Sequence, residues 1–404
     1  MGNLTNEAGE NSRESGGADM RLAATSEVER QLTRERQIAF WVGSAFYRAS
    51  SRLSRDLSVL AGAIERERLG SLRVLDAMAG SGVRALRYWG EAGATALFAN
   101  EGNPDVLPIL RENLAEAIAA GAATIASNDA NRAFFQCYID DDYYDIVDVD
   151  GFGAPVPWLS TSLWAVKLGG LVYLASTDGR TATGHQPEQS LRLYGARARV
   201  HPAAHEQGLR LLLGSLQQQA AVKGFGIAPV FSLFRGEVYR VMVRLTKGQK
   251  LTERNYAYLG YCHDCGNYQV LPWHRLGKAY CSHISQHGDD LPLTLTGPMW
   301  VGDLHDRDYL AQMQAGARSR NWPDVVDWIE VASAEAEMPP YFFKLGEIGK
   351  RGRMDIPKRE RLVAALRDRG FRATACHVNR EAFKTTADLQ TCVAIARELS
   401  QNLT

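Results

Sequence analysis

Residues 74–84 read VLDAMAGSGVR, and this stretch decides the fold. The apolar segment that ends in Asp76 predicts a buried strand, and a helical pattern begins at Val83 after a turn with two glycines. Such a turn lets the backbone approach a ligand closely, and the helix N-terminus adds a partial positive charge. The spacing is not that of a dinucleotide fingerprint, and tight packing alone can require such a turn. A ligand site here therefore needs support from other segments.

Strand-like and helix-like blocks alternate from residue 72 to residue 245. The last two strand-like blocks lie close enough in sequence to form an antiparallel pair. This order predicts a Rossmann-like α/β sheet with helices on both faces. The expected strands are 72–77, 96–100, 122–126, 144–149, 171–176, 226–233 and 238–245, and the expected helices are 83–92, 104–120, 158–167 and 205–223.

Composition divides the chain into three parts. Residues 1–36 are polar and lack aromatic side chains, so we expect a disordered tail. The alternating blocks place the main α/β domain at residues 37–246. Past the Lys247-Gly248 turn the chain is punctuated by Gly and Pro and enriched in His, Cys and Trp. Residues 247–404 are therefore expected to form a smaller α+β C-terminal domain.

Charge and cysteine content limit the possible partners and compartments. Lys+Arg and Asp+Glu both number 46, so a nucleic-acid partner would need a local basic face. No run of about 18 apolar residues is present, which predicts no membrane span. Six cysteines in 404 residues suit a reducing compartment. We expect a cytoplasmic monomer, with a plastid as the alternative if the tail is a residual presequence.

Three acids follow consecutive predicted strands, and together they indicate a nucleotide-like ligand. Asp76 ends the first strand, Glu101 follows the second, and Asp129 follows the third. Glu101 could accept ribose hydroxyls and Asp129 an adenine amino group, although either acid could simply cap a helix. Carboxyl ends of parallel strands lie at one sheet edge, where α/β folds bind ligands. The order of these acids around the glycine turn, with Gly80 and Gly82, is that of S-adenosylmethionine-dependent methyltransferases.

The fourth strand leads into DVDGFGAP at residues 148–155, which suits methylation of an exocyclic amine. The lone pair of such an amine is delocalised into the ring, so the amine is a poor nucleophile. A carboxylate and a backbone carbonyl that accept its N–H bonds would localise and aim the lone pair. We expect Asp150 and the Gly151 carbonyl to be these acceptors, and Phe152 to stack on the base. Alternatively, Asp148 and Asp150 only end the strand.

Several further segments resemble the tRNA guanine-N2 dimethyltransferase family, which methylates guanosine 26 of tRNA. The branch found in cyanobacteria and plastid-bearing organisms resembles this chain most. The resemblance covers about residues 37 to 398. The matching segments are FYRA at 46–49, SRDLS at 54–58, DVDGFGAP at 148–155, TDG at 177–179 with His185, HEQGLR at 205–210, GPMW at 297–300, and His377 with Lys384-Thr385.

The resemblance implies roles for residues at the matching positions. It implies a cofactor, S-adenosylmethionine, and a partner, tRNA. Phe46 and Phe152 would flank the target guanine, with Asp150 as the acceptor. The implied contacts to the cofactor come from Arg55, Arg84, Glu101, Asp129 and Ala130. Each Arg could instead form a structural salt bridge, and Arg55 and Arg84 could pair with Asp side chains.

The chain departs from the family pattern in two segments. The family Asn-Pro is Arg48-Ala49 here, and the Asn before Arg-Asp is Ser54. The Pro of the acceptor loop is Gly151, which keeps the carbonyl but loses the fixed φ angle. These departures keep two alternatives open. The protein could methylate another amine in ribosomal RNA or protein, or it could be a non-catalytic RNA-binding relative.

Two features of the C-terminal part indicate a metal and RNA. Cys262 and Cys265 form a Cys-x2-Cys pair, and Cys281 with His283 follows after 15 residues. This spacing is typical of structural zinc, with His287 as a rival fourth ligand and reduced free cysteines as the alternative. Residues 344–384 carry 12 Lys and Arg against 5 Asp and Glu, with an amphipathic pattern. A basic helix face would bind phosphates, unless it is only a solvated face with internal ion pairs.

Overall fold

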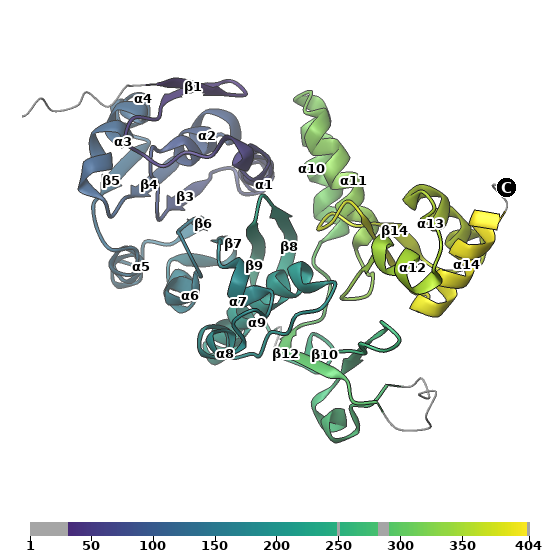
Figure 1. Cartoon of the computed structure of the whole chain (residues 1–404). Coiled ribbons are helices and arrows are strands. Elements are labelled where there is room, and N and C mark those ends of the chain that lie inside the picture. The colour runs from purple at the N-terminus through teal and green to yellow at the C-terminus, as the bar shows by residue number, and fades with distance from the viewer. Residues whose placement is uncertain (1–30, 249–250, 282–290, 402–404) are drawn as a thin grey trace, which may run out of the picture.

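The computed structural model describes residues 31–248, 251–281 and 291–401, and its centre is a seven-stranded sheet (Figure 1). The strand order is β5-β4-β3-β6-β7-β9-β8. The first five strands in this order are parallel, and β9 runs antiparallel to both of its neighbours. The strands are β3 (Arg73–Asp76), β4 (Ala96–Asn100), β5 (Ala123–Ala126), β6 (Tyr144–Val149), β7 (Val166–Ser176), β8 (Phe225–Arg235) and β9 (Val238–Lys247).

Helices cover both faces of this sheet, because its central strands are apolar on both sides. On one face Leu75 and Val147 pack in a core with α5, α6 and α9. On the other face Val74 and Ile146 pack in a core with α1, α2 and α3. The helices are α1 (Arg52–Leu69), α2 (Val83–Ala92), α3 (Leu107–Asn113), α4 (Ala115–Ala119), α5 (Ala130–Ile139), α6 (Val156–Ser162), α7 (Gly179–Ala182), α8 (Pro187–Tyr194) and α9 (Ala204–Val222).

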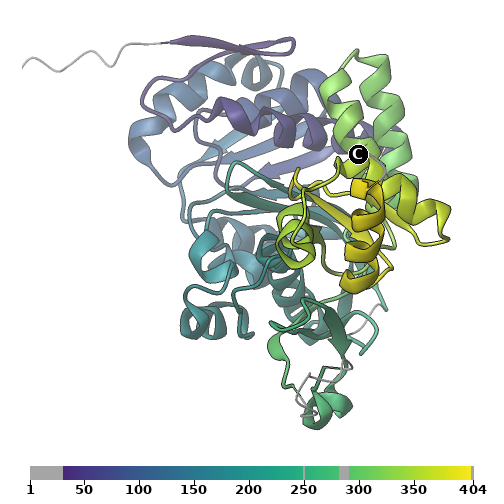
Figure 2. The same cartoon turned by 45° about the vertical axis from the view of Figure 1, so that its right-hand side comes forward.

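The C-terminal half adds two small sheets and five helices within the described residues. Helices α10 and α11 share a core with α1, and in Figure 2 the last helices (yellow) lie below them. Lys384 Nζ donates to Glu206 Oε1 at 2.6 Å, a buried bond between the C-terminal half and α9. The elements are β10 (Tyr256–Tyr261), β11 (Tyr268–Leu271), β12 (Thr294–Trp300), α10 (Arg307–Ser319), α11 (Pro323–Glu335), β13 (Phe343–Lys344), α12 (Leu345–Gly352), α13 (Arg359–Asp368), β14 (Ala373–Ala375), β15 (Ala382–Thr385) and α14 (Leu389–Gln401).

The structure corrects three sequence-based expectations. The helix expected at 158–167 ends at Ser162, and Val166 already begins β7, whose β-branched and apolar residues fit a buried strand. The helix expected at 104–120 is a 3-10 turn followed by α3 and α4, separated at Leu114. Residues 32–35, expected in the disordered tail, form strand β1 (Leu32–Glu35), which pairs with β2 (Ile38–Trp41). Within the expected tail, residues 1–30 lie outside the described residues.

No helix among the described residues is long and apolar enough to cross a membrane.

Candidate active site

A cavity of about 910 Å³ opens at the carboxyl edge of the sheet, next to β3 and β6. The strand order reverses between these two strands, which is where open α/β sheets bind ligands. The cavity brings together residues that are up to about 190 positions apart in sequence, from Phe46 to Arg240. Of the residues expected to bind the cofactor or the base, its lining includes Phe46, Arg55, Asp76, Gly80, Arg84, Glu101, Asp129, Ala130, Asp150 and Phe152.

The two glycines of the turn have different positions relative to this cavity. Gly80 lines it with a φ of +54°, and a Cβ there would meet only the Phe46 carbonyl oxygen, at 4.0 Å. Gly82 is not part of the lining, and it has a φ of +81° just before α2. A Cβ at Gly82 would lie 2.6 Å from Leu110 Cδ1. Gly82 is therefore explained by the helix start and by packing on α3, while Gly80 faces the ligand space.

Glu101 and Asp129 both line the cavity, and both are also engaged by backbone N–H groups. Glu101 Oε2 accepts from the Gly80 N–H at 2.8 Å, and Oε1 accepts from the Asn103 N–H at 2.8 Å. Glu101 thereby fixes the glycine turn against the end of β4. Asp129 is the N-cap of α5, with Oδ1 accepting from the Asn131 N–H at 2.9 Å. The helix-cap alternative thus holds for Asp129, and its contact with adenine stays a prediction.

Asp76 and Asp148 form a buried pair of carboxylates with too few donors. Asp76 Oδ2 and Asp148 Oδ1 are buried and have no hydrogen-bond partner within the described residues. Asp148 Oδ2 accepts from Tyr88 Oη at 3.0 Å and lies 3.4 Å from Arg84 Nε. Burial, together with the charge of Asp148, raises the pKa of Asp76 to about 8. Asp76 lines the cavity, and its unpaired oxygen would suit a ligand that carries N–H groups.

Asp150 is held by two arginines at the end of β6. Arg84 and Arg240 both donate to its Oδ2, the latter at 2.9 Å. Burial alone would raise the pKa of Asp150, but Arg240 and Arg84 outweigh it and hold that pKa well below its usual range. Oδ1 makes no hydrogen bond to any described residue, and about a quarter of the side chain (26%) is exposed. Asp150 is thus an ionised carboxylate whose Oδ2 is held by Arg84 and Arg240 and whose Oδ1 can accept a hydrogen bond from a ligand.

Sequence reasoning missed Arg240. This residue lies in β9, on the far side of β7 from Asp150, and only 5% of it is exposed. The signal in the sequence was a single Arg in the apolar segment VYRVMV at residues 238–243. A charged side chain in the middle of a buried strand requires a partner of opposite charge.

Phe46 and Phe152 both line the cavity, and their rings pack edge to face. Their ring centroids are 4.9 Å apart at an interplanar angle of 74°, and both rings are more than half exposed. A base inserted between two rings needs about 7 Å, which is twice an ordinary contact distance. The predicted flanking of a guanine by these rings therefore requires that they move apart.

Gly151 is explained by the residues around the acceptor loop. A Cβ at this position would lie 2.6 Å from Met78 Sδ and about 3.0 Å from the Trp158 ring. Met78 belongs to the glycine turn and Trp158 to α6, so these two side chains fill the space that a larger residue would need. The departure from the family proline is therefore matched by packing from both sides.

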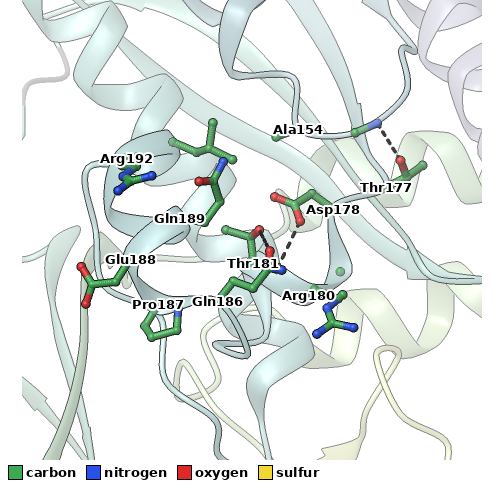
Figure 3. Close-up of a pocket in the computed structure, with 13 residues that line it drawn as sticks. Ala154, Thr177, Asp178, Arg180, Thr181, Gln186, Pro187, Glu188, Gln189 and Arg192 are labelled. Atoms are coloured by element: carbon green, nitrogen blue, oxygen red, sulfur yellow. Dashed lines mark hydrogen bonds between the residues drawn. The ribbon is translucent and has the colours of Figure 1, made fainter.

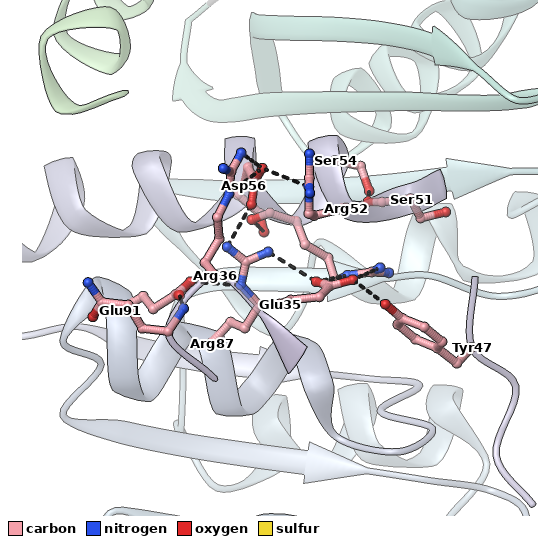
Figure 4. Close-up of polar contacts among 12 residues, drawn as sticks. Glu35, Arg36, Tyr47, Ser51, Arg52, Ser54, Asp56, Arg87 and Glu91 are labelled. Carbon is pink, nitrogen blue, oxygen red and sulfur yellow. Dashed lines mark hydrogen bonds and ion pairs between the residues drawn. The ribbon is translucent and has the colours of Figure 1, made fainter. Parts of the chain in front are cut away.

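Arg55 lines the cavity, but its guanidinium belongs to a buried polar network (Figure 4). Arg55 Nε donates to Glu35 Oε2 at 2.8 Å, and its Nη2 donates to the Arg48 carbonyl at 3.0 Å. Glu35 also accepts from Tyr47 Oη at 2.7 Å and from Arg87 Nη1 at 3.2 Å. The structural salt bridge considered for Arg55 is present, and a contact with the cofactor stays a prediction.

The network continues from Arg87 to the surface. Arg87 Nη2 donates to Asp56 Oδ1 at 2.7 Å, and Arg36 Nη2 donates to Asp56 Oδ2 at 2.6 Å. Arg36 and Arg52 each donate to Asp324 of α11 at 2.8 Å. The network therefore ties the N-terminal hairpin and the segment that carries Phe46 to α1, α2 and the C-terminal half.

Three of the four expected zinc ligands lie together. One possible ligand atom from each of Cys262, Cys265 and Cys281 falls within 4.8 Å of the others, and Cys265 Sγ is 3.5 Å from Cys281 Sγ. The Cys265 N–H points to Cys262 Sγ at 3.5 Å, as expected for a turn that presents two thiolates to one ion. His283 and its rival His287 lie outside the described residues.

The basic segment of the C-terminal half divides into paired and unpaired side chains. Arg367 donates to the Ala373 carbonyl at 2.7 Å, Arg359 pairs with Glu360 at 2.8 Å, and Arg369 pairs with Glu398. These residues match the alternative of an internally paired face. The side chains of five exposed cations make no hydrogen bond or ion pair within the described residues: Lys350, Arg353, Lys358, Arg361 and Arg380.

Comparison with known proteins agrees with this geometry. Residues 27–397 match the sequence model of the N2,N2-dimethylguanosine tRNA methyltransferase family. Relatives named tRNA (guanine(26)-N(2))-dimethyltransferase include that of Thermoplasma acidophilum, 29% identical over 85% of this chain and 88% of its own length. The relative from Thermococcus kodakarensis is 26% identical, covering 91% of this chain and 97% of its own.

A solved structure has the same fold. Trm1 from Pyrococcus horikoshii, in a complex with S-adenosyl-L-methionine, aligns with a TM-score of 0.77 and 24% identity over 90% of this chain and 99% of its own. The expected Rossmann-like methyltransferase fold is thereby confirmed.

Proposed function

Because the chain belongs to the N2,N2-dimethylguanosine tRNA methyltransferase family, we propose that it transfers methyl groups from S-adenosylmethionine to N2 of a guanosine in tRNA. The observation that carries the proposal is the cavity that joins the acids of three strand ends to Asp150, Phe46 and Phe152. Position 26 follows from the names of the relatives.

The residues present fit S-adenosylmethionine, whose sulfonium supplies the methyl group. The unpaired Oδ2 of Asp76 suits the ammonium of the methionine part, because a buried carboxylate oxygen needs a donor. Gly80, held by Glu101, lets a ligand approach the turn. Glu101 itself would accept from the ribose, and Asp129 with Ala130 would lie along the adenine. Arg84 would keep its ion pairs with Asp150 and Asp148 when the cofactor binds. Its positive charge would then influence the cofactor without a direct contact.

Asp150 is proposed to orient the target amine. Its Oδ1 and the Gly151 carbonyl would accept the two N–H bonds of N2, so that the lone pair points to the methyl carbon. Attack would form the N–C bond as the S–C bond breaks, S-adenosylhomocysteine would leave, and the methylated amine would lose a proton to water. The low pKa of Asp150, set by Arg240 and Arg84 against its burial, keeps it ionised, so it orients the amine rather than storing the proton. This role is mainly positioning and electrostatics.

A tRNA footprint on the C-terminal half is supported by its unpaired cations. Lys350, Arg353, Lys358 and Arg361 are exposed, and each could release counterions on contact with a phosphate. We expect their combined substitution to weaken tRNA binding and to reduce its salt dependence. A monomer in the cytoplasm stays our expectation, and light scattering of the purified protein would test the monomer.

A structural zinc ion at Cys262, Cys265 and Cys281, completed by His283, is proposed from the proximity of the three sulfurs. Metal analysis after purification under reducing conditions should give about one zinc per chain. Cys265→Ser should lower that ratio, while Cys392→Ser, at a buried cysteine of α14, should leave it unchanged. A ratio near zero in the unchanged protein would end this proposal.

The test of the proposed function is methylation of unmodified tRNA with guanosine at position 26. Nucleoside mass spectrometry should detect N2-methylguanosine or N2,N2-dimethylguanosine, and a tRNA with adenosine at that position should stay unmodified. If the protein binds S-adenosylmethionine but produces neither nucleoside, its substrate is another amine or it is not a catalyst.

A further inference from the structure

A second hollow lies beside the acceptor loop, with a volume of about 930 Å³ (Figure 3). Gly153 and Ala154 of the loop form one wall, and the opposite wall comes from α7, α8 and the segment between them. Thr177 lines both this hollow and the active-site cavity. The hollow therefore begins where the proposed site of the target base ends, and none of the roles assigned above uses it.

Two hydrogen bonds fix the shared wall. The Gly153 N–H donates to Thr177 Oγ1 at 2.8 Å, and the Thr177 N–H donates to the Gly153 carbonyl at 2.9 Å. Gly153 directly follows Phe152, the ring expected to stack on the target base. A ligand that settles in the hollow thus contacts the same rigid unit that presents Phe152.

Asp178, which lines the hollow, has a carboxylate oxygen without a donor among the described residues. Asp178 Oδ1 accepts from the Thr181 N–H at 3.2 Å and caps α7, whereas Oδ2 is buried and has no hydrogen-bond partner within the described residues. Asp178 lies at the centre of Figure 3, between Thr177 and Gln189. The carboxylate of Asp178 accepts hydrogen bonds, and the carboxamide of Gln189 can both donate and accept them. This combination suits the hydrogen-bonding edge of a nucleobase.

Two cations border the hollow. Arg180 and Arg192 are exposed, and in Figure 3 Arg192 lies to the left of Asp178 and Arg180 below it. Neither guanidinium makes an ion pair or hydrogen bond among the described residues, unlike Arg197 nearby, which pairs with Glu188 at 2.9 Å. Unpaired guanidinium groups at the rim of a polar hollow are suited to phosphates.

We propose that this hollow seats the nucleotide next to the target guanosine in the same RNA strand. Arg180 and Arg192 bind its phosphates, and Asp178 with Gln189 contacts the edge of its base. When a guanosine is drawn out of its stack, the nucleotides bonded to it are also brought close to the protein. The hollow adjoins the active-site cavity and is lined by hydrogen-bond acceptors and cations that could bind such a nucleotide. The inference rests on the proposed function, because it needs an RNA substrate in the active-site cavity.

The first experiment tests the phosphate contacts. The double variant Arg180→Ala with Arg192→Ala should raise KM for tRNA about tenfold with little change in kcat, and affinity for S-adenosylmethionine should stay the same. The slope of log affinity against log salt should become shallower by about 1.4, or 0.7 for each lost contact to a single strand. The matched control is Arg111→Ala on α3, an exposed arginine that lines neither cavity.

The second experiment tests the base contact. Removing the base at position 25 or at position 27 of the tRNA should cost the unchanged enzyme about tenfold in kcat/KM at one of the two positions. Asp178→Asn should lose most of that sensitivity. Asn is as good a helix cap as Asp, so α7 should remain folded.

The outcomes separate this inference from the proposed function. If the unchanged protein methylates tRNA, but the double variant behaves like Arg111→Ala or neither abasic tRNA is a poorer substrate, the inference is overturned and the function stands. If the unchanged protein methylates no tRNA, the proposed function fails and the inference fails with it.

Discussion

Glu35 and Asp76 are buried to the same extent, with 2% of each residue exposed, yet their surroundings are opposite. Glu35 receives hydrogen bonds from Arg55, Arg87 and Tyr47. Burial would raise the pKa of Glu35, but the hydrogen bonds from Arg55 and Tyr47 and the charges of Arg55 and Arg87 together outweigh that effect and lower the pKa. The pKa of Asp76 is raised to about 8 by burial and by Asp148.

The comparison separates carboxylates that hold the fold from carboxylates that await a ligand. A buried charge is stable when donors surround it, and it is costly when they are missing. The Glu35 network provides donors from within the chain, whereas Asp76 at the end of β3 has an oxygen that no donor in the described part of the chain reaches. Asp150 belongs to both classes of carboxylate, since its Oδ2 accepts from arginines of the chain and its Oδ1 can accept from a ligand.

The largest expected effect on stability comes from breaking the Glu35 network. Glu35→Gln should lower the free energy of unfolding by about 3 to 5 kcal/mol, because Arg55 and Arg87 would stay buried without their charge partner. Urea unfolding followed by circular dichroism measures this loss. Glu330→Gln, which removes an exposed pair with Arg318, is the matched control and should change little. Equal losses in the two variants would show that the buried network is not a special source of stability.

A substitution of Asp150 tests the carboxylate that has one paired and one unpaired oxygen. Asp150→Asn should lower kcat about 10³-fold, since an amide is a weaker acceptor and no longer offsets the charge of Arg84 and Arg240. Single-turnover methylation of tRNA measures the loss, and calorimetric titration with S-adenosylmethionine should show that the cofactor still binds. Methyl transfer at an unchanged rate would contradict the proposed role of Asp150 in orienting the amine.

Asp76 tests the unpaired region, and here stability and function should change in opposite directions. The pKa of Asp76 is raised in the folded protein, so ionisation opposes folding as pH rises from about 4, its value in an unfolded chain, towards 8. Asp76→Asn should therefore raise the melting temperature of the ligand-free protein at pH 8 and change it little at pH 4. The same change should weaken binding of S-adenosylmethionine about tenfold or more.

Thermal unfolding at both pH values, with and without the cofactor, measures these two effects. The Glu35 network provides the contrast, because Glu35→Gln should be destabilising at pH 8. A lower melting temperature of Asp76→Asn at pH 8 would mean that Asp76 is paired after all.

Many of the residues that line the candidate active site could be predicted, because the sequence patterns that indicate them are local. A strand that ends in an acid, followed by a turn or a helix, is visible within about ten residues, and Asp76, Glu101 and Asp150 were found in this way. The order of the acids along the chain then determines their places along the edge, since consecutive parallel strands are joined by helices.

The paired network and the second hollow could not be predicted, because they depend on contacts between distant segments. Glu35 lies in a stretch expected to be disordered, and its partner Arg87 is 52 residues away. Arg240 reaches Asp150 from a strand 90 residues later. The packing of Leu110 against Gly82 was also not predictable, because the turn sequence does not show which side chain lies there.

The smallest expected effect sharpens the comparison at the surface end of the network. Asp324 pairs with Arg36 and Arg52, but 43% of its side chain is exposed, so water can replace much of what these pairs contribute. Asp324→Asn should therefore lower the free energy of unfolding by at most about 1 kcal/mol, and 1 M salt should reduce the difference from the unchanged protein. Urea unfolding at low and high salt measures both values. A loss as large as that of Glu35→Gln would show that donors alone, and not burial, decide which carboxylates hold this fold.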